Sequence, residues 1–169
     1  MFKNSTMLAF ALASFTLIAT ASGTHEGGHG HDDSAIGQPG QTAKVTRTIK
    51  VDMADTMRFT PANPSVKLGE TIRFVITNSG LVKHEFVLGL EKDLKEHYEV
   101  MKKFPEMEHD DPNMVTVAPG KTGEVIWQFT KSGKVDFACL QPGHYDAGMK
   151  GAIKVGGGAP VRTAHQHRP

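Results

Sequence analysis

Short stretches in which apolar and polar residues alternate make up most of the chain after Lys44. The clearest of them is Thr71 to Thr77. Its apolar residues Ile72, Phe74 and Ile76 fall on one side of an extended backbone, a pattern typical of a strand with one buried face. Similar runs predict further strands at Lys44 to Val51, Ser65 to Leu68, His84 to Leu88, Met114 to Val117, Gly123 to Phe129, Lys134 to Cys139 and Gly151 to Val155. Gly and Pro turns separate these runs, so the pattern predicts an all-β fold, an antiparallel sandwich of two sheets.

The segment from Asp93 to Phe104 has a helical period instead. Its apolar residues Leu94, Tyr98 and Met101 are three or four positions apart, which places them on one face of a helix. Pro105 follows directly and ends such a helix. We therefore expect one helix inserted between strands of the sandwich.

The beginning of the chain has the features of an export signal. Lys3 is positively charged, Met7 to Ile18 is apolar, and Ala19-Thr20-Ala21 matches the small-x-small pattern of a cleavage site. The apolar run is too short to span a membrane comfortably. We expect a signal peptide at residues 1–21, export to the periplasm and no stable membrane insertion after cleavage. An uncleaved anchor is the alternative.

The 169 residues suit one globular domain with flexible ends. Residues 22–43 are rich in Gly, His, Asp and Gln and lack apolar periodicity, so they are predicted to form a flexible His-rich arm. The β pattern occupies residues 44–155, and the Gly-rich polar residues 156–169 are predicted to form a flexible tail.

Composition and charge narrow the possible functions. The formal net charge is +1 and the basic residues are spread along the chain, so nucleic-acid binding is not expected. The chain has one cysteine, Cys139, and therefore cannot form an intramolecular disulfide. An unpaired thiol in an oxidising compartment needs protection, which burial or a bound metal can provide. Cys139 is thus either a buried inert thiol or a metal ligand.

Residue types that bind metals follow Cys139 in one loop. His144 and Met149 come at intervals of five residues, and Pro142-Gly143 provides a turn between the thiol and the imidazole. Soft sulfur donors suit Cu(I), and two His with one Cys and a weakly bound Met are typical of a blue-copper site. Zinc fits less well, because Met is not among its usual ligands.

The second imidazole must come from elsewhere in the fold, and His84 is the best candidate because it begins a predicted strand. The predicted copper ligands are therefore His84, Cys139, His144 and Met149. The alternative is an unrelated β-sandwich with a core cysteine and surface histidines. The order and spacing of the four residue types favour the metal site.

The pattern N-x₅-H-E-F followed by C-x₄-H-x₄-M resembles the cupredoxins over roughly Lys44 to Val155. The resemblance implies a cupredoxin-like Greek-key β-sandwich that holds one copper ion. Asn78 begins the pattern, and it resembles a family Asn that ties the upstream ligand loop to the Cys loop through hydrogen bonds. A plain turn residue is the alternative for Asn78.

Two further groups of side chains are candidate accessory metal ligands. They are His25, His29 and His31 in the arm, and Met107, His109 and Met114 after the predicted helix. Imidazoles on a flexible chain can capture Cu(II) or Zn(II), and thioethers are soft Cu(I) ligands. The alternatives are a solvated linker for the first group and methionines that fill gaps under the helix for the second.

A His-rich arm before a cupredoxin domain resembles a narrower group, the periplasmic copper-tolerance cupredoxins of the CopI type. That resemblance implies copper tolerance or homeostasis, with copper ions as ligand and a periplasmic redox or copper-handling protein as a candidate partner. A soluble electron carrier is the alternative function, because the same ligand set serves one-electron exchange. An enzyme is not expected, because copper enzymes of this kind normally need a further catalytic copper or several domains.

Overall fold

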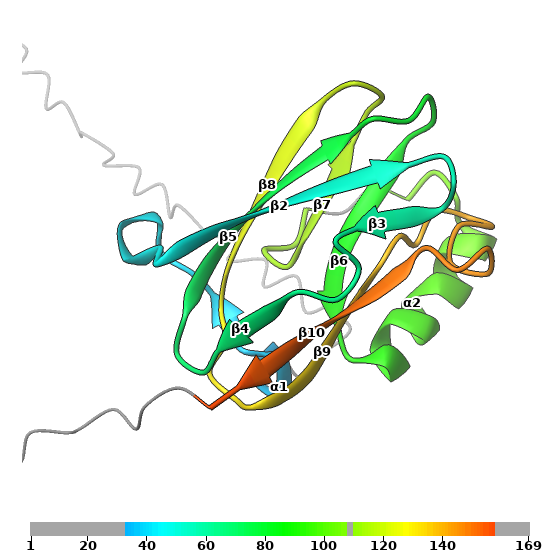
Figure 1. Ribbon diagram of the computed structural model, residues 1–169. Helices are drawn as coiled ribbons and strands as arrows, with labels where there is room; N and C mark the ends of the chain where they lie inside the picture. Colours follow the sequence, from blue (N-terminus) through cyan, green and yellow to red (C-terminus); the bar gives the residue numbers. More distant parts are fainter. Residues whose placement is uncertain (1–32, 108–109, 158–169) are drawn as a thin grey trace, which may run out of the picture.

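Two five-stranded sheets make up the body of the computed structural model, which describes residues 33–107 and 110–157 (Figure 1). The strands are β1 (Gln38–Pro39), β2 (Arg47–Ala54), β3 (Arg58–Thr60), β4 (Ser65–Lys67), β5 (Thr71–Asn78), β6 (His84–Gly89), β7 (Met114–Val117), β8 (Thr122–Gln128), β9 (Gly133–Ala138) and β10 (Lys150–Gly156). The helices are α1 (Asp33–Ile36), the short 3₁₀ helix η1 (Thr42–Lys44) and α2 (Glu91–Lys103). One sheet has the order β1-β8-β5-β2-β3 and the other β4-β10-β9-β6-β7. The predicted β-sandwich with an inserted helix is confirmed.

Both sheets contain a parallel pair, so the expectation of an antiparallel sandwich is wrong at two places. β5 runs parallel to β2, and β10 runs parallel to β4. A hairpin cannot join parallel strands, which need a crossover. Here the chain passes from β3 in one sheet to β4 in the other before it returns at β5, and this detour lets β5 run in the direction of β2.

The core lies between the sheets and consists of their inward-facing apolar side chains. In β5, Ile72, Phe74 and Ile76 are all fully buried, as their alternation predicts. Aromatic rings from both sheets meet there, and the ring centroids of Phe74 and Phe86 are 5.4 Å apart. Interiors packed in this way hold backbone and side chains in one arrangement, which a precise binding site requires.

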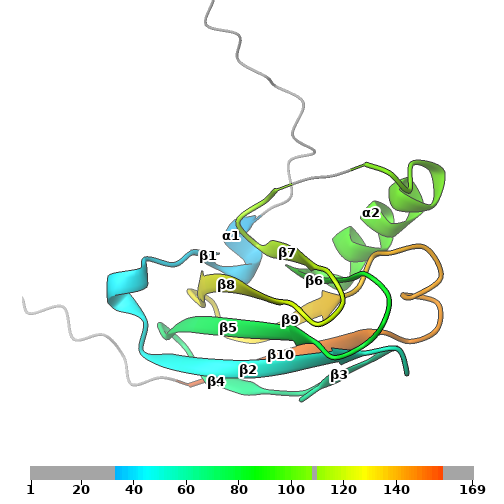
Figure 2. The ribbon, with the colours of Figure 1, turned by 90° about the horizontal axis from the view of Figure 1, so that it is seen from above.

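α2 packs on β6 and β9 and lies at one side of the molecule (Figure 2). Its buried residues are Leu94, Tyr98 and Met101, the three that helical spacing predicts. They close a second apolar cluster on the outer face of the β6–β9 sheet. The helix begins at Glu91 rather than at Asp93, and both acidic side chains suit the positive end of the helix dipole.

Residues 36–40 pack against the sandwich, although the sequence pattern assigns them to the flexible arm. Ile36 is 3% exposed and belongs to the main core cluster. The Nε1–H of Trp127 donates a hydrogen bond of 3.0 Å to the carbonyl of Ile36, and β1 pairs with β8. One apolar residue creates no periodicity, so pattern analysis cannot detect this contact.

β3 is a strand that the sequence pattern does not predict. It has three residues with only Phe59 buried, too few to show alternation, and it lacks a Gly turn such as Gly69-Glu70, which marks the equally short β4. β3 pairs with β2 through a turn in which Met57 has a φ of 58°, a left-handed conformation that is uncommon outside glycine.

The predicted signal peptide, residues 1–21, and the arm residues 22–32 lie outside the described residues. So does the tail from residue 158, whereas Gly156, which the pattern assigns to the tail, ends β10. Within residues 33–107 and 110–157, none of the helices has the length and apolar character needed to cross a membrane.

The packing of Ile36 leads to a test. We predict that Ile36→Ala lowers the free energy of unfolding by about 2 to 5 kcal/mol, the usual cost of truncating a buried isoleucine. Urea unfolding of the metal-free protein measures this change. Leu81→Ala is the control, because Leu81 is 85% exposed and its truncation should cost less than about 0.5 kcal/mol. Equal stability of the two variants would show that residues 36–40 do not pack on the domain.

Candidate metal centre

Cys139 lies where the pairing between β9 and β6 ends. The last paired residues are Val87 and Ala138. Cys139 is the next residue after Ala138, and its Sγ accepts a hydrogen bond of 3.3 Å from the backbone N–H of Glu85. The Cys139 side chain is fully buried. The sulfur is therefore held by a strand end and by a hydrogen bond from the neighbouring strand.

His84 begins β6 and has an exposed fraction of 0%. Its Nδ1 lies 4.0 Å from the Sγ of Cys139. Its Nε2 lies 3.1 Å from Oδ1 of Asp55. One ring nitrogen of His84 thus faces the thiol, and the other faces a carboxylate.

His144 reaches the same point from a tight turn. Its N–H donates to the carbonyl of Gln141 over 3.0 Å, and Gly143 has a φ of 85°, which glycine adopts without a steric penalty. The Nδ1 of His144 lies 3.2 Å from the Sγ of Cys139 and 3.1 Å from the Nδ1 of His84. Partial burial lowers the pKa of His144, and the nearby His84 lowers it further. The lowered pKa favours the neutral ring that a metal binds.

Three donor atoms therefore converge. His84, Cys139 and His144 form a group whose ligand atoms are close enough to share one ion. Metal bonds of about 2.0 to 2.3 Å, as zinc forms with imidazole and thiolate, hold the donors of one ion roughly 3 to 4 Å apart. The observed separations of 3.1, 3.2 and 4.0 Å fall in this range. Two imidazoles and a thiol make a donor set that suits copper.

The fourth predicted ligand, Met149, is fully buried beside this group. Its N–H donates to the carbonyl of His144 over 3.0 Å, and its own carbonyl accepts the N–H of Cys139 over 3.1 Å. The loop thus closes on itself and brings Met149 next to two of the three donor residues.

Asn78 supports the loop that precedes His84, but it does not reach the loop of Cys139. Its Nδ2 donates to the carbonyls of Val82 and Val117 over 2.8 and 2.9 Å, and its Oδ1 accepts the N–H of Gly80. The expected link to the Cys loop is therefore wrong. Asn78 is fully buried and ties its own loop to β7, whereas the backbone of Glu85 contacts the cysteine.

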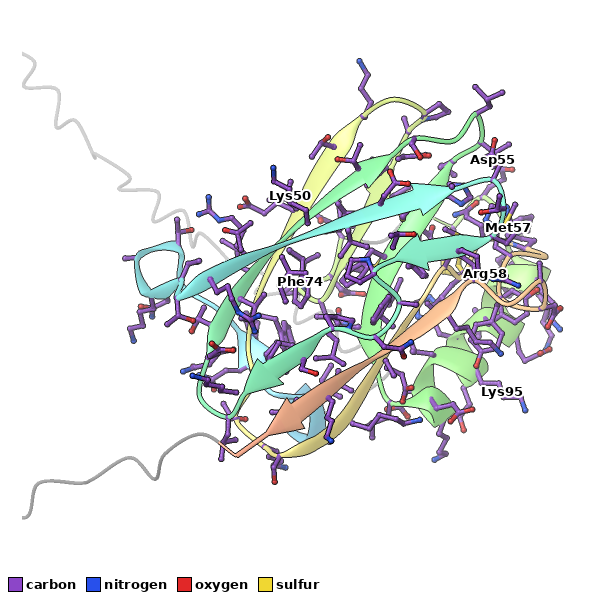
Figure 3. The ribbon with its side chains drawn as sticks, in the orientation of Figure 1. Lys50, Asp55, Met57, Arg58, Phe74 and Lys95 are labelled. Carbon is purple, nitrogen blue, oxygen red and sulfur yellow. The ribbon has the colours of Figure 1, made fainter. Side chains whose placement is uncertain are left out.

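The turn after β2 and the first residue of β3 contribute two side chains, Asp55 and Arg58, that the sequence analysis does not single out. Figure 3 shows Asp55 and Arg58 with Met57 at the end of the sandwich that carries the β9–β10 loop. Arg58 donates from Nη1 to the carbonyl of Ala147 over 2.9 Å. Gly148 lets the guanidinium approach, since a Cβ there would lie 3.1 Å from Nη1. A ligand histidine needs an acceptor for its second nitrogen, but the sequence does not tell which acidic residue provides it.

α2 also holds the metal loop, through Tyr98. The backbone N–H of Gly143 donates to the Tyr98 hydroxyl over 2.9 Å, and that hydroxyl donates to Asp146 over 2.9 Å. The ring of Tyr98 stacks on that of Tyr145, with centroids 5.1 Å apart. The inserted helix therefore fixes the turn that presents His144.

The accessory candidates have different positions. Met114 is 7% exposed and packs in the cluster under α2, so it fills space there as the alternative interpretation holds. Met107 is exposed, and His109 lies outside the described residues. His25, His29 and His31 also lie outside the described residues.

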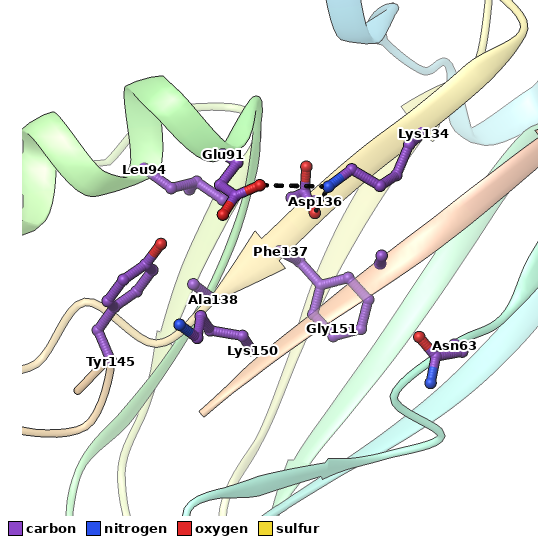
Figure 4. Close-up of a pocket in the computed structure, with 11 residues that line it drawn as sticks. Asn63, Glu91, Leu94, Lys134, Asp136, Phe137, Ala138, Tyr145, Lys150 and Gly151 are labelled. Carbon is purple, nitrogen blue, oxygen red and sulfur yellow. Dashed lines mark hydrogen bonds and ion pairs between the residues drawn. The ribbon is translucent and has the colours of Figure 1, made fainter. Parts of the chain in front are cut away.

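A separate hollow lies between α2 and the strands β9 and β10 (Figure 4). Lys134 bridges Glu91 and Asp136 at its rim, over 3.4 and 3.0 Å. None of the four predicted ligands lines it. The fourth charged residue of this hollow, Lys150, lies over the ring of Tyr145, with its Nζ 4.3 Å from the ring centroid.

Residues 43–156 match the family described as copper binding proteins, plastocyanin/azurin family. The chain belongs to this family. The cupredoxin fold and a copper-binding role are thereby established, and the convergence of His84, Cys139 and His144 provides the candidate copper site.

Two relatives of this cupredoxin carry a more specific name. The copper-resistant cuproprotein CopI of Rubrivivax gelatinosus is 53% identical over 132 residues, which cover 78% of this chain and 80% of that protein. The copper-resistant cuproprotein CopI of Pseudomonas aeruginosa is 39% identical over 153 residues, which cover 72% and 82%.

Solved structures agree on the cupredoxin fold. Auracyanin B superposes with a TM-score of 0.58 at 23% identity, over 71% of this chain and 96% of that one. The reduced auracyanin of Roseiflexus castenholzii gives a TM-score of 0.56 at 22% identity, over 66% and 98%.

The burial of Cys139 leads to a pH prediction for the metal-free cupredoxin. Burial raises the pKa of the Cys139 thiol from its ordinary value of 9.0 to about 12. The folded chain therefore keeps this proton at a pH where the unfolded chain has lost it. The resulting stability is complete below pH 9.0 and is lost as the pH rises toward about 12.

Urea unfolding over this pH range tests the prediction. Cys139→Ser is the matched control, because it removes the thiol but leaves every other titrating group in place. The wild-type protein should lose more stability with rising pH than this variant does. Parallel pH profiles would contradict the prediction.

Proposed function

We propose that this cupredoxin binds one copper ion through His84, Cys139, His144 and Met149 and serves in copper resistance in the periplasm. The observation that carries the proposal is the convergence of two imidazole nitrogens and one thiol within 4.0 Å. Relatives named as copper-resistant cuproproteins, matched over about four fifths of their length, support the biological role.

Met149 completes the proposed ligand set. Its residue is fully buried and its backbone is hydrogen-bonded to both His144 and Cys139. A thioether would add a weak fourth bond to a copper ion held by two His and one Cys. Bound copper supplies one-electron exchange between Cu(I) and Cu(II). The protein supplies the soft sulfur donors and a site from which water is largely excluded.

Export fits this role, since Lys3, the apolar run and the Ala19-Thr20-Ala21 site are typical of a cleaved signal peptide. We further propose that His25, His29 and His31 add copper-binding capacity next to the domain. Tethered imidazoles are suited to capture ions at a moderate affinity. Binding and handling of copper, rather than catalysis, is the activity that we propose.

Electron transfer is the second candidate, and the exposure of His144 favours it. The other two donors are fully buried, whereas the His144 ring is only partly covered. A partly exposed ligand offers a route for electrons between the metal and a redox partner. The same exposure also lets a copper ion enter. The growth of a strain that lacks this protein, rather than the geometry of the site, must therefore separate the two functions.

The copper site has a direct spectroscopic test. The Cu(II)-loaded protein should show an intense visible band from thiolate-to-copper charge transfer, and Cys139→Ser should abolish it because the chain has no other thiol. Replacement of His25, His29 and His31 by Ala should leave the band intact and lower only the total copper bound. A visible band that survives Cys139→Ser would refute the site.

Growth of a deletion strain tests the biological role. Strains that lack this protein should grow poorly at high copper, and the wild-type gene but not the Cys139→Ser variant should restore growth. Equal amounts of the two proteins must be verified by immunoblot. Normal growth at high copper together with a respiratory defect at low copper would instead support electron transfer.

The role of Met149 predicts a graded effect. Met149→Leu should retain copper and the visible band but shift the reduction potential, because only the weakest of the four proposed bonds would be lost. Met53→Leu is the control, since Met53 is a fully buried methionine of the same core cluster. Redox titration of both variants measures the potential. An equal potential in the two variants would exclude Met149 as a ligand.

A further inference from the structure

The carboxylate of Asp55 lies at the edge of the His84 ring that carries Nε2, on the side away from the other donors. Nδ1 of this buried ring faces Cys139 and His144, and Nε2 lies 3.1 Å from Oδ1 of Asp55. A neutral imidazole has one N–H, and a carboxylate can only accept. The proton must therefore be on Nε2 for this hydrogen bond to form, which leaves the lone pair of Nδ1 free to bind a metal.

The loop before His84 is built around the same carboxylate. The N–H of Leu81 donates to Oδ2 of Asp55 over 2.7 Å, and the N–H of Val82 donates to Oδ1 over 3.4 Å. A Cβ on Gly80 would lie 2.1 Å from Oδ1, so only glycine leaves room for the carboxylate at this point. Asp55 is thus fixed in place by backbone groups and does not depend on His84 for its orientation.

Asp55 carries a negative charge at neutral pH. Two backbone N–H groups, of Leu81 and Val82, point at its oxygens, and such donors stabilise the anionic form of a carboxyl group. The Asp55 side chain has an exposed fraction of 38%, so solvent reduces the electrostatic effect of its charge on the site without abolishing it. A nearby anion stabilises the more positive of two oxidation states.

We infer that Asp55 is a positioning residue of the copper site, which holds His84 in the Nε2–H tautomer and favours Cu(II) over Cu(I) through its charge. This inference rests on the proposed function. It assigns to the β2–β3 turn a role that the ligand motif does not reveal. Partners of this kind typically change metal affinity by about 10- to 100-fold when they are removed.

Two substitutions separate orientation from charge. Asp55→Asn keeps an oxygen acceptor of the same size but removes the charge, and Asp55→Ala removes both. Asp52→Asn is the matched control. Asp52 lies three residues before Asp55, on β2, and it accepts a hydrogen bond from Ser79 rather than from His84. Thermal unfolding of each metal-free variant verifies that it is folded.

The measurements are the affinities for Cu(I) and for Cu(II), each by competition with a chelator, and the reduction potential. Asp55→Ala should lose about 10- to 100-fold in Cu(II) affinity. Asp55→Asn should recover part of that loss yet keep a ratio of Cu(II) to Cu(I) affinity that is shifted toward Cu(I), with a higher reduction potential. Asp52→Asn should match the wild-type protein.

The metal-free protein provides an independent measurement. Long-range ¹H–¹⁵N spectra should show His84 as the Nε2–H tautomer in the wild-type protein and a mixture of tautomers in Asp55→Ala. An Nδ1–H tautomer in the wild-type protein, or an affinity ratio in Asp55→Asn equal to that of Asp52→Asn, would overturn the inference. Failure of the proposed function is separate, since it appears as copper binding that does not require Cys139.

Discussion

The hydrogen bond from the Glu85 backbone to the sulfur of Cys139 joins the two strands on which the whole metal centre depends. It continues the pairing of β6 with β9 by one step beyond Val87 and Ala138, with a side chain in place of a carbonyl. His84 precedes Glu85, so the same contact sets the distance between the first imidazole and the thiol. A slip of either strand by one residue would turn these side chains to the opposite face of the sheet. The register of the sandwich therefore determines the site.

Side chains from three other parts of the fold hold the two ligand loops against this frame. Arg58 at the start of β3 and Tyr98 from α2 contact the loop that carries His144. Asp55 and Asn78 hold the loop that leads into His84. The donors thus lie within 4.0 Å of one another through contacts made by the protein alone. A site that is organised in this way binds its ion with little further ordering of the chain.

The sequence predicts the strands with clear alternation and the helix with clear spacing, because each has several buried residues at a regular period. It does not predict β3 or the packing of Ile36, because one buried residue creates no period and no Gly turn marks β3 as one marks the equally short β4. The donor residues could be named from their chemistry and order. Asp55 could not, because a turn aspartate looks the same whether or not a histidine faces it. Asn78 shows the converse limit, since the residue was singled out but its partner in β7 depends on how distant strands meet.

The complete burial of Cys139 has a consequence for the oxidation of the protein during storage. A protein with one cysteine can form a disulfide only with a second molecule, and it can do so only while the thiol is uncovered. Each covalent dimer in a stored sample therefore records an occasion on which two domains had opened. The rate at which such dimers accumulate under oxidising conditions therefore measures how often the native sandwich opens enough to expose Cys139.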